Sequence, residues 1–183
     1  IRFRRNFGQT AAFAAGFAHA RGRLVVTSDG DLQNDPRDIE GMAQLLDQGG
    51  YDIVCGWRKD RKDTFVNRRL PSIIANWIIS KSTGVALHDY GCSLKVFRAE
   101  VVKSMRLYGE MHRFMPALLA LDGFRVSEVK VSHHPRIHGV TKYNWKRAVK
   151  GFVDMIAIWF WRKYSHRPIH LFGGSGILLS LVG

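Results

Sequence analysis

Apolar positions in the N-terminal third of the chain follow helical and strand-like spacing in turn. Phe13 and Phe17 lie four residues apart in an alanine-rich stretch, which predicts a helix over residues 8–20. A short apolar run at residues 24–27 predicts a buried strand. The acidic segment Ser28–Asp31 is therefore expected at the end of a strand.

A second helix and a second strand follow. Asp35 is a candidate N-cap and Pro36 suits a first helical turn, so the helix is expected to begin there. Gly49 and Gly50 are expected to end it, and residues 51–55 predict the next strand. The apolar face of this helix consists of Ile39, Met42, Leu45 and Leu46. Helices and strands that alternate in this way predict an α/β layer with a parallel sheet.

The middle of the chain continues the α/β pattern after a basic loop at residues 57–63. Residues 84–97 are expected to be irregular or extended, and residues 124–133 predict a strand because they alternate in part. Further helices are expected over residues 70–80, 99–107 and 113–121. The pattern therefore predicts an α/β fold with a sheet flanked by helices.

The C-terminal part has a different character. Residues 143–164 predict a longer helix with tryptophan and phenylalanine on one face and basic residues on the other. This pattern is typical of a helix lying in a membrane interface, although an ordinary core helix would also carry such an apolar face. Residues 169–183 are almost uncharged and shorter than the roughly 20 residues that span a bilayer. We interpret them as the start of a transmembrane helix, and a C-terminal core helix is the alternative.

The charge balance restricts the partners of the chain. Lys and Arg number 28 and Asp and Glu number 15, so the formal net charge is +13. This excess indicates a negative partner, such as nucleic acid, anionic lipid or a phosphorylated substrate. The two cysteines, Cys55 and Cys92, are too few for a disulfide framework, and small buried thiols in a reducing compartment are expected.

The most informative polar segment is Asp29-Gly30-Asp31-Leu32-Gln33. On an extended backbone, residues 29, 31 and 33 point to one side, so two carboxylates and one amide oxygen would converge. Hard oxygen ligands of this kind suit Mg²⁺ or Mn²⁺, and the ion is usually shared with substrate phosphates. Asp29, Asp31 and Gln33 are therefore candidate metal ligands. An acidic turn that caps the following helix is the alternative.

Basic side chains are candidate phosphate ligands. Arg58, Arg68 and Arg69 are suited to bidentate contacts with a phosphate group, whereas most of the neighbouring lysines fit a solvated charge run. Asp89 adds a single carboxylate in a glycine-containing turn, which by itself indicates little.

A histidine-rich segment at residues 133–139 resembles a metal cluster at first sight. It contains no cysteine, and adjacent histidines on a strand point to opposite faces, so a zinc site is disfavoured. A glycine-hinged loop that closes over anionic phosphates with Arg136 and Lys142 explains the same residues better.

Three ordered motifs carry a resemblance over nearly the whole chain. They are RRNFGQTAAFAAGFAHARGRLVVTSDGDLQNDP, DYGCSLKVFR and HHPRIHGVTKYNW. Together they resemble the inverting GT-A-fold glycosyltransferases that act on polyprenyl phosphates, a group that includes dolichol-phosphate mannose synthases. The resemblance implies a GT-A fold, in which a Rossmann-like mixed sheet is flanked by helices.

The resemblance also implies roles for the candidate residues. Asp29, Asp31 and Gln33 would surround a Mg²⁺ or Mn²⁺ ion and the donor diphosphate, with Asp31 and Asp89 closest to the chemistry. Arg58 and an arginine of the Arg68–Arg69 pair would meet the acceptor phosphate. The segment from Arg136 to Lys142 matches the mobile loop of the family.

The implied partners are a nucleotide-sugar donor, a polyprenyl phosphate and a membrane, with the catalytic domain on the cytoplasmic side of the bacterial inner membrane. A homo-oligomer is compatible with the sequence. The domains would be a partial catalytic domain at residues 1–142, an interfacial helix at 143–167 and the start of a transmembrane helix at 168–183. The chain departs from the family in having Gly30 where alanine is usual, and in starting after the first strand and the base-binding aspartate.

Three other classes of protein would explain part of the sequence. A nucleic-acid-binding module would interleave basic and aromatic residues on a sheet or a recognition helix, whereas here the basic residues cluster in a loop and in amphipathic helices. A processive polysaccharide synthase would carry a Gln-x-x-Arg-Trp motif, which this sequence lacks. A non-catalytic membrane scaffold would have no need for the two aspartates.

Overall fold

The structure is a computed structural model that describes residues 1–59, 84–107 and 111–135, with single positions at 80, 109, 160, 164, 169, 172, 173, 176 and 180. The chain divides into two compact units, Ile1–Lys142 and Tyr143–Gly183. All described positions of the second unit are helical. None of the described helices combines the length and apolarity that crossing a membrane requires. The helices expected at residues 70–80 and 143–164 fall almost entirely outside the described residues.

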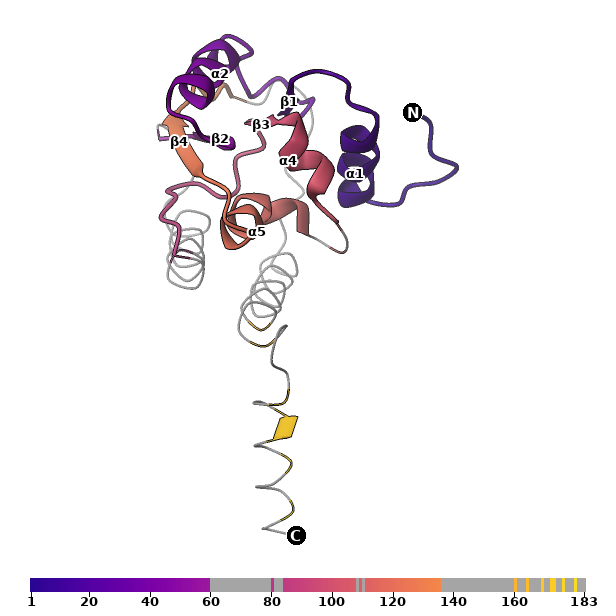
Figure 1. Ribbon diagram of the computed structural model, residues 1–183. Helices are drawn as coiled ribbons and strands as arrows, with labels where there is room; N and C mark the ends of the chain where they lie inside the picture. Colours follow the sequence, from indigo (N-terminus) through magenta and orange to yellow (C-terminus); the bar gives the residue numbers. More distant parts are fainter. Residues whose placement is uncertain are drawn as a thin grey trace. The chain divides into compact units, whose positions relative to one another are not determined.

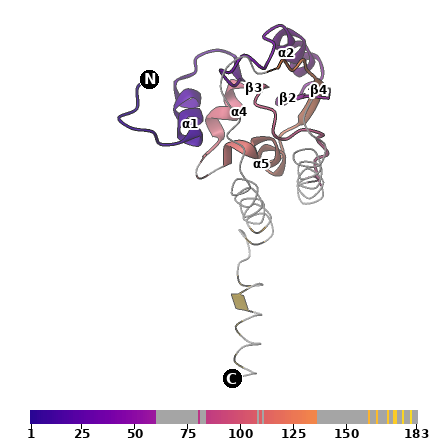
Figure 2. The same cartoon turned by 180° about the vertical axis from the view of Figure 1, so that it is seen from behind.

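The first unit contains helices and strands in mixed order. Its helices are α1 (Gln9–His19), α2 (Asp38–Gln48), α4 (Ala99–Ser104) and α5 (Met115–Leu121), with a 3₁₀ turn η2 at Met111–Arg113. Its strands are β1 (Leu24–Thr27), β2 (Ile53–Trp57), β3 (Lys95–Arg98) and β4 (Val126–Lys130). Figures 1 and 2 show α2 above the strands and α5 below them in opposite views.

The four strands form one mixed sheet in the order β1-β3-β2-β4. β3 runs antiparallel to both β1 and β2, whereas β2 and β4 are parallel. The expected mixed sheet is confirmed. The first two strands run in the same direction, as a parallel layer requires, but β3 lies between them and pairs antiparallel with both. The two central strands, β2 and β3, are the most buried.

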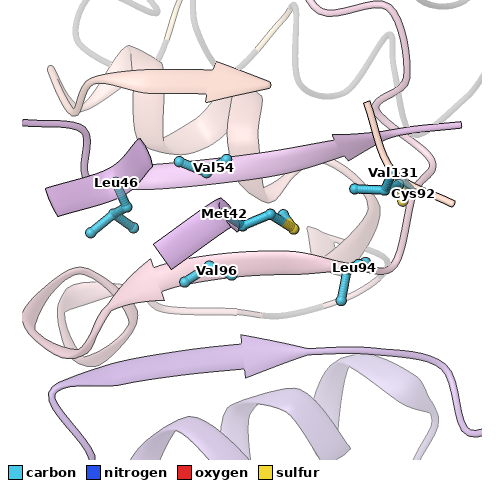
Figure 3. Packing of buried hydrophobic residues seen from close by; sticks show 7 residues of the cluster. All are labelled: Met42, Leu46, Val54, Cys92, Leu94, Val96 and Val131. Atoms are coloured by element: carbon cyan, nitrogen blue, oxygen red, sulfur yellow. The ribbon is translucent and has the colours of Figure 1, made fainter. Parts of the chain in front are cut away.

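The core lies between α2 and the sheet. Met42 and Leu46 of α2 are fully buried against Val54 of β2 and Val96 of β3, which face each other in the strand register (Figure 3). The cluster is completed by Cys92, Leu94 and Val131. The apolar face expected for this helix is thus confirmed at its two deepest positions.

Helix α2 begins later than the sequence indicated. Asp35 does accept a hydrogen bond from a backbone N–H, that of Arg37, with 2.9 Å between Oδ1 and N. This contact forms a turn over Pro36, and the helix itself begins at Asp38. Gly49 ends the helix as expected, and Gly50 follows with φ of 61°, in the left-handed region that glycine tolerates.

Candidate functional site

The candidate residues come together at one edge of the sheet. Thr27 at the end of β1 and Cys55 near the end of β2 both pair with Lys95, the first residue of β3. β3 runs in the opposite direction to the other strands. The loop that precedes β3 therefore lies at the same edge of the sheet as the loops that follow β1, β2 and β4. Ligand sites in open α/β sheets lie at such an edge.

The acidic loop after β1 is bent, so the expected extended course of residues 29–33 is wrong. Asp31 accepts a hydrogen bond from the backbone N–H of Gln33, with 3.3 Å between Oδ1 and N. Leu32, between them, has φ of 62°, which is uncommon for a residue other than glycine. A short side chain that bonds to the backbone two residues on makes a local turn, and this competes with extended structure.

Ser93 anchors this loop to the start of β3. Its hydroxyl accepts hydrogen bonds from the backbone N–H of Asp29 at 3.3 Å and from the Asn34 side chain at 2.9 Å. Its carbonyl accepts the hydroxyl proton of Thr27, with 2.8 Å between the oxygens. Ser93 and Asn34 were not predicted as site residues, because no local pattern shows that residues about sixty positions apart meet.

The histidine-rich segment after β4 lies against the same acidic loop. The backbone N–H of His134 donates to the carbonyl of Gln33 at 2.8 Å, and His133 forms an isolated bridge with Asn34. The Gln33 side chain donates to the carbonyl of His134 at 3.3 Å, with its Nε2 3.4 Å from Nε2 of His133. His134 also lies 3.1 Å from Asp35, measured from Nε2 to Oδ2. The segment that leads into Arg136 is therefore attached directly to the candidate metal loop.

Arg58 and Asp89 are brought together as an ion pair, although the sequence analysis gave them separate roles. Arg58 Nε lies 2.7 Å from Asp89 Oδ2, and Nη2 lies 3.0 Å from Oδ1. Asp89 Oδ1 also accepts the backbone N–H of Gly91 at 3.1 Å. Parallel bonds between a guanidinium and a carboxylate hold both groups in fixed orientation.

A lysine and two thiols lie beneath this pair. Lys95 is only 3% exposed and donates from its ammonium group to the carbonyl of Cys92. Burial raises the pKa of the Cys55 thiol to about 12 and raises that of Cys92 as well. Both thiols therefore stay protonated and unreactive, as expected for small buried residues. Lys95 had no distinguishing signal in the sequence.

Four other candidates, Arg68, Arg69, Arg136 and Lys142, lie outside the described residues and stay predictions.

The described residues fit a divalent cation that is shared with a substrate. They contain no group of three or more His, Cys, Asp and Glu side chains arranged to hold a metal ion. The loop does offer two hard carboxylate ligands, Asp29 and Asp31, and Ser93 anchors the loop through the backbone N–H of Asp29. Mg²⁺ is usually bound by one or two carboxylates together with substrate phosphates, so a donor set of this size is suitable.

The chain belongs to glycosyl transferase family 2, because the model of that family matches residues 1–106. The expected kind of family is thereby confirmed.

Two curated relatives indicate the branch of this family to which the chain is similar. The chain is 49% identical over 179 residues to dodecaprenyl-phosphate galacturonate synthase of Rhizobium johnstonii. This alignment covers 97% of this chain and 53% of the relative. It is also 41% identical over 152 residues to undecaprenyl-phosphate 4-deoxy-4-formamido-L-arabinose transferase of Pseudomonas paraeruginosa. This second alignment covers 83% of this chain and 44% of the relative. The chain thus spans about half the length of these relatives.

Solved structures show the same fold. Glucosyl-3-phosphoglycerate synthase of Mycobacterium tuberculosis with phosphoglyceric acid gives a TM-score of 0.62 at 16% identity, over 88% of this chain and 56% of that one. The same enzyme with Mn²⁺, UDP-glucose and phosphoglyceric acid gives 0.59 at 18% identity, over 86% and 55%. This similarity confirms the GT-A-like mixed α/β architecture.

Proposed function

We propose that this chain is the metal- and acceptor-binding part of an enzyme that transfers a sugar from a nucleotide donor to a polyprenyl phosphate, with inversion at the anomeric carbon. The observation that carries the proposal is the meeting of the acidic loop, Arg58 and Asp89 at one edge of the sheet. Both curated relatives are named for attaching a sugar to a polyprenyl phosphate, which supports the same acceptor class here.

The donor side of the site is the loop that carries Asp29, Asp31 and Gln33. Their oxygen atoms would hold Mg²⁺ or Mn²⁺, and the ion would neutralise the charge that develops on the departing nucleoside diphosphate. Arg136 and Lys142 would add positive charge to the same diphosphate. Because Gln33 and Asp35 are hydrogen-bonded to the histidine segment, the loop is held in one place before the donor arrives.

The acceptor side is Arg58, with Arg68 and Arg69 as further phosphate ligands. A phosphate monoester has a second pKa of about 6, so the attacking oxygen is already largely ionised at neutral pH. The chain therefore needs no strong general base. Asp89 orients the Arg58 guanidinium and would bind sugar hydroxyls. Catalysis would come from holding two anionic substrates together in the right orientation.

The location follows from the acceptor. A polyprenyl phosphate is confined to a membrane, so residues 143–167 would lie in the interface and residues 168–183 would begin a transmembrane helix. The basic residues near this boundary suit the cytoplasmic face of a bacterial inner membrane. Residues 1–142 would then be the catalytic portion present in this chain.

The test is a transfer assay of the full-length protein in membranes. Undecaprenyl phosphate is offered with a panel of sugar nucleotides that includes uronic acid and aminosugar donors, with Mg²⁺, with Mn²⁺ or with a chelator. We expect lipid-linked product with one donor and loss of that product in the chelator. Binding to anionic vesicles without product from any donor would instead identify a non-catalytic lipid-binding module.

A further inference from the structure

A second contact lies beside the Arg58–Asp89 ion pair. Trp57 directly precedes Arg58, and His88 directly precedes Asp89. The Trp57 and His88 rings are stacked, with centroids 4.2 Å apart and an interplanar angle of 18°. The two segments therefore meet through two consecutive contacts, one between rings and one between charges.

Glu128 of β4 forms hydrogen bonds with the same histidine. Its carboxylate accepts the backbone N–H of His88, with 2.9 Å between Oε2 and N, and also accepts Nδ1–H of the same residue. The Glu128 side chain is only 13% exposed, whereas that of His88 is 64% exposed. The largely buried Glu128 carboxylate thus contacts both the backbone and the side chain of the exposed residue His88.

The aromatic partner is held as well. Lys59 and Lys130 place their ammonium groups 5.8 Å and 5.6 Å from the centroid of the Trp57 ring. Cations at this distance from an indole face are attracted to it. His88 thus contacts Trp57 of β2 and Glu128 of β4, which lie on two neighbouring parallel strands.

We propose that His88 is a positioning residue that sets the Asp89 carboxylate against Arg58. The proposal rests on the proposed function, in which this ion pair meets the acceptor phosphate and the transferred sugar. The peptide bond between His88 and Asp89 transmits the position of the ring to the carboxylate. The donor loop is anchored separately, by Ser93.

Because His88 and the donor loop are anchored by different residues, a change at His88 should affect the kinetic constants for the acceptor and leave metal binding intact. Removal of the His88 side chain should reduce turnover and raise the KM for polyprenyl phosphate, because Asp89 and Arg58 lose their alignment. The dependence on Mn²⁺ concentration should stay unchanged, because the donor loop keeps its own anchor at Ser93. A shift of about 1 Å in a catalytic arrangement can cost about 100-fold in rate, so a loss of at least tenfold in kcat/KM for the acceptor is expected.

The experiment compares three substitutions in the full-length enzyme. His88→Ala removes both contacts. His88→Asn keeps an N–H donor near the position of Nδ1, and His88→Phe keeps the stacked ring without a donor. We expect His88→Asn to restore most of the acceptor kcat/KM and His88→Phe to restore little, since Glu128 requires a donor. The matched control is His19→Ala, since this histidine lies at the end of α1 and bonds only locally to the carbonyl of Ala15.

The outcomes separate the two proposals. Absence of transfer by the wild-type protein and the His19→Ala variant would mean that the proposed function is wrong. Transfer by both, together with an unchanged acceptor kcat/KM in His88→Ala, would overturn the role of His88. An equal loss in His88→Asn and His88→Phe, or an altered dependence on Mn²⁺ concentration in either variant, would also overturn it. If His88→Ala does not fold, the comparison of the other two variants still decides.

Discussion

Arg58 and Asp89 face each other through two parallel bonds, 2.7 Å from Nε to Oδ2 and 3.0 Å from Nη2 to Oδ1. Their side chains are only 13% and 9% exposed. A nearly buried pair of this kind is costly to break, because removing one partner leaves the other charge without compensation. The pair is therefore both a structural element and part of the proposed site.

Substitution of one member of this pair should destabilise the protein strongly. We expect Asp89→Asn to lower the free energy of unfolding by about 3–5 kcal/mol, because the Arg58 guanidinium would stay buried without its charged partner. Denaturant unfolding of the purified protein measures the change. The exposed pair of Arg23 and Asp47 is the control, and Asp47→Asn should change the stability little. Similar stabilities for both variants would contradict the prediction.

Replacement of one candidate metal ligand should weaken metal binding directly. We expect Asp31→Asn to lower Mn²⁺ affinity in the presence of a nucleoside diphosphate by at least about tenfold, because one anionic oxygen ligand is lost. Electron paramagnetic resonance of free Mn²⁺ measures this independently of catalysis. Asp122→Asn, at the end of α5, is the control for a lost surface charge. Unchanged Mn²⁺ affinity in Asp31→Asn would refute the assignment of this ligand.

The strained position in the acidic loop leads to a stability prediction. Leu32 has φ of 62°, and its side chain stands in solvent with the residue 62% exposed. Leu32→Gly should raise the free energy of unfolding by about 1 kcal/mol, because glycine reaches the left-handed region without steric cost. Leu32→Val should lower it, because a branched Cβ crowds the backbone further. Thermal melts of the two variants compare them, and the opposite order would show that the bend is not the source of strain.

The buried thiol of Cys55 predicts a dependence of stability on alkaline pH. Its pKa is raised to about 12 by burial, whereas an unfolded thiol titrates at 9.0. Below pH 9 the thiol is protonated in both states, and as pH rises toward 12 only the unfolded state loses the proton. The stabilising contribution of the native environment is therefore lost progressively over this window.

Two measurements check this prediction. Unfolding free energies of wild type and Cys55→Ala should converge as the pH rises from 9 toward 12, because alanine has no proton to release. At pH 8 a thiol reagent should leave Cys55 of the native protein unmodified and label it in denaturant. Rapid labelling of the native protein would show that the thiol is accessible.

Local patterns in the sequence were sufficient where neighbouring residues decide the structure. The strand at Leu24–Thr27 has the bounds that the sequence predicts, and the glycine pair ends α2 as expected. The strand expected at residues 51–55 lies two residues later, at Ile53–Trp57, and other elements are placed correctly but are shorter. The helix expected at residues 113–121 begins at Met115, and the strand expected at residues 124–133 covers Val126–Lys130.

Contacts between distant segments could not be predicted in this way. The central place of β3 depends on pairing between strands about forty residues apart, which leaves no periodic signal in either strand. The bend at Leu32 is accompanied by a hydrogen bond from the backbone N–H of Gln33 to Asp31 and by contacts of Gln33 with His134, about a hundred residues away. Ser93 and Glu128 are single polar residues in otherwise ordinary segments, and only the folded chain shows what they hold.

The reversed direction of β3 has a consequence for how such an enzyme can diversify. In a fully parallel sheet, only the segments that follow the strands lie at the edge where the carboxyl ends of the strands meet. Here the strand that runs backwards in the middle contributes the segment that precedes it, so residues 84–94 reach the centre of the edge. Under the proposed function, changes at exposed positions of this segment, such as Ala86, would alter the surroundings of the transferred sugar without replacing a core residue. A new substrate preference can therefore arise without rebuilding the framework.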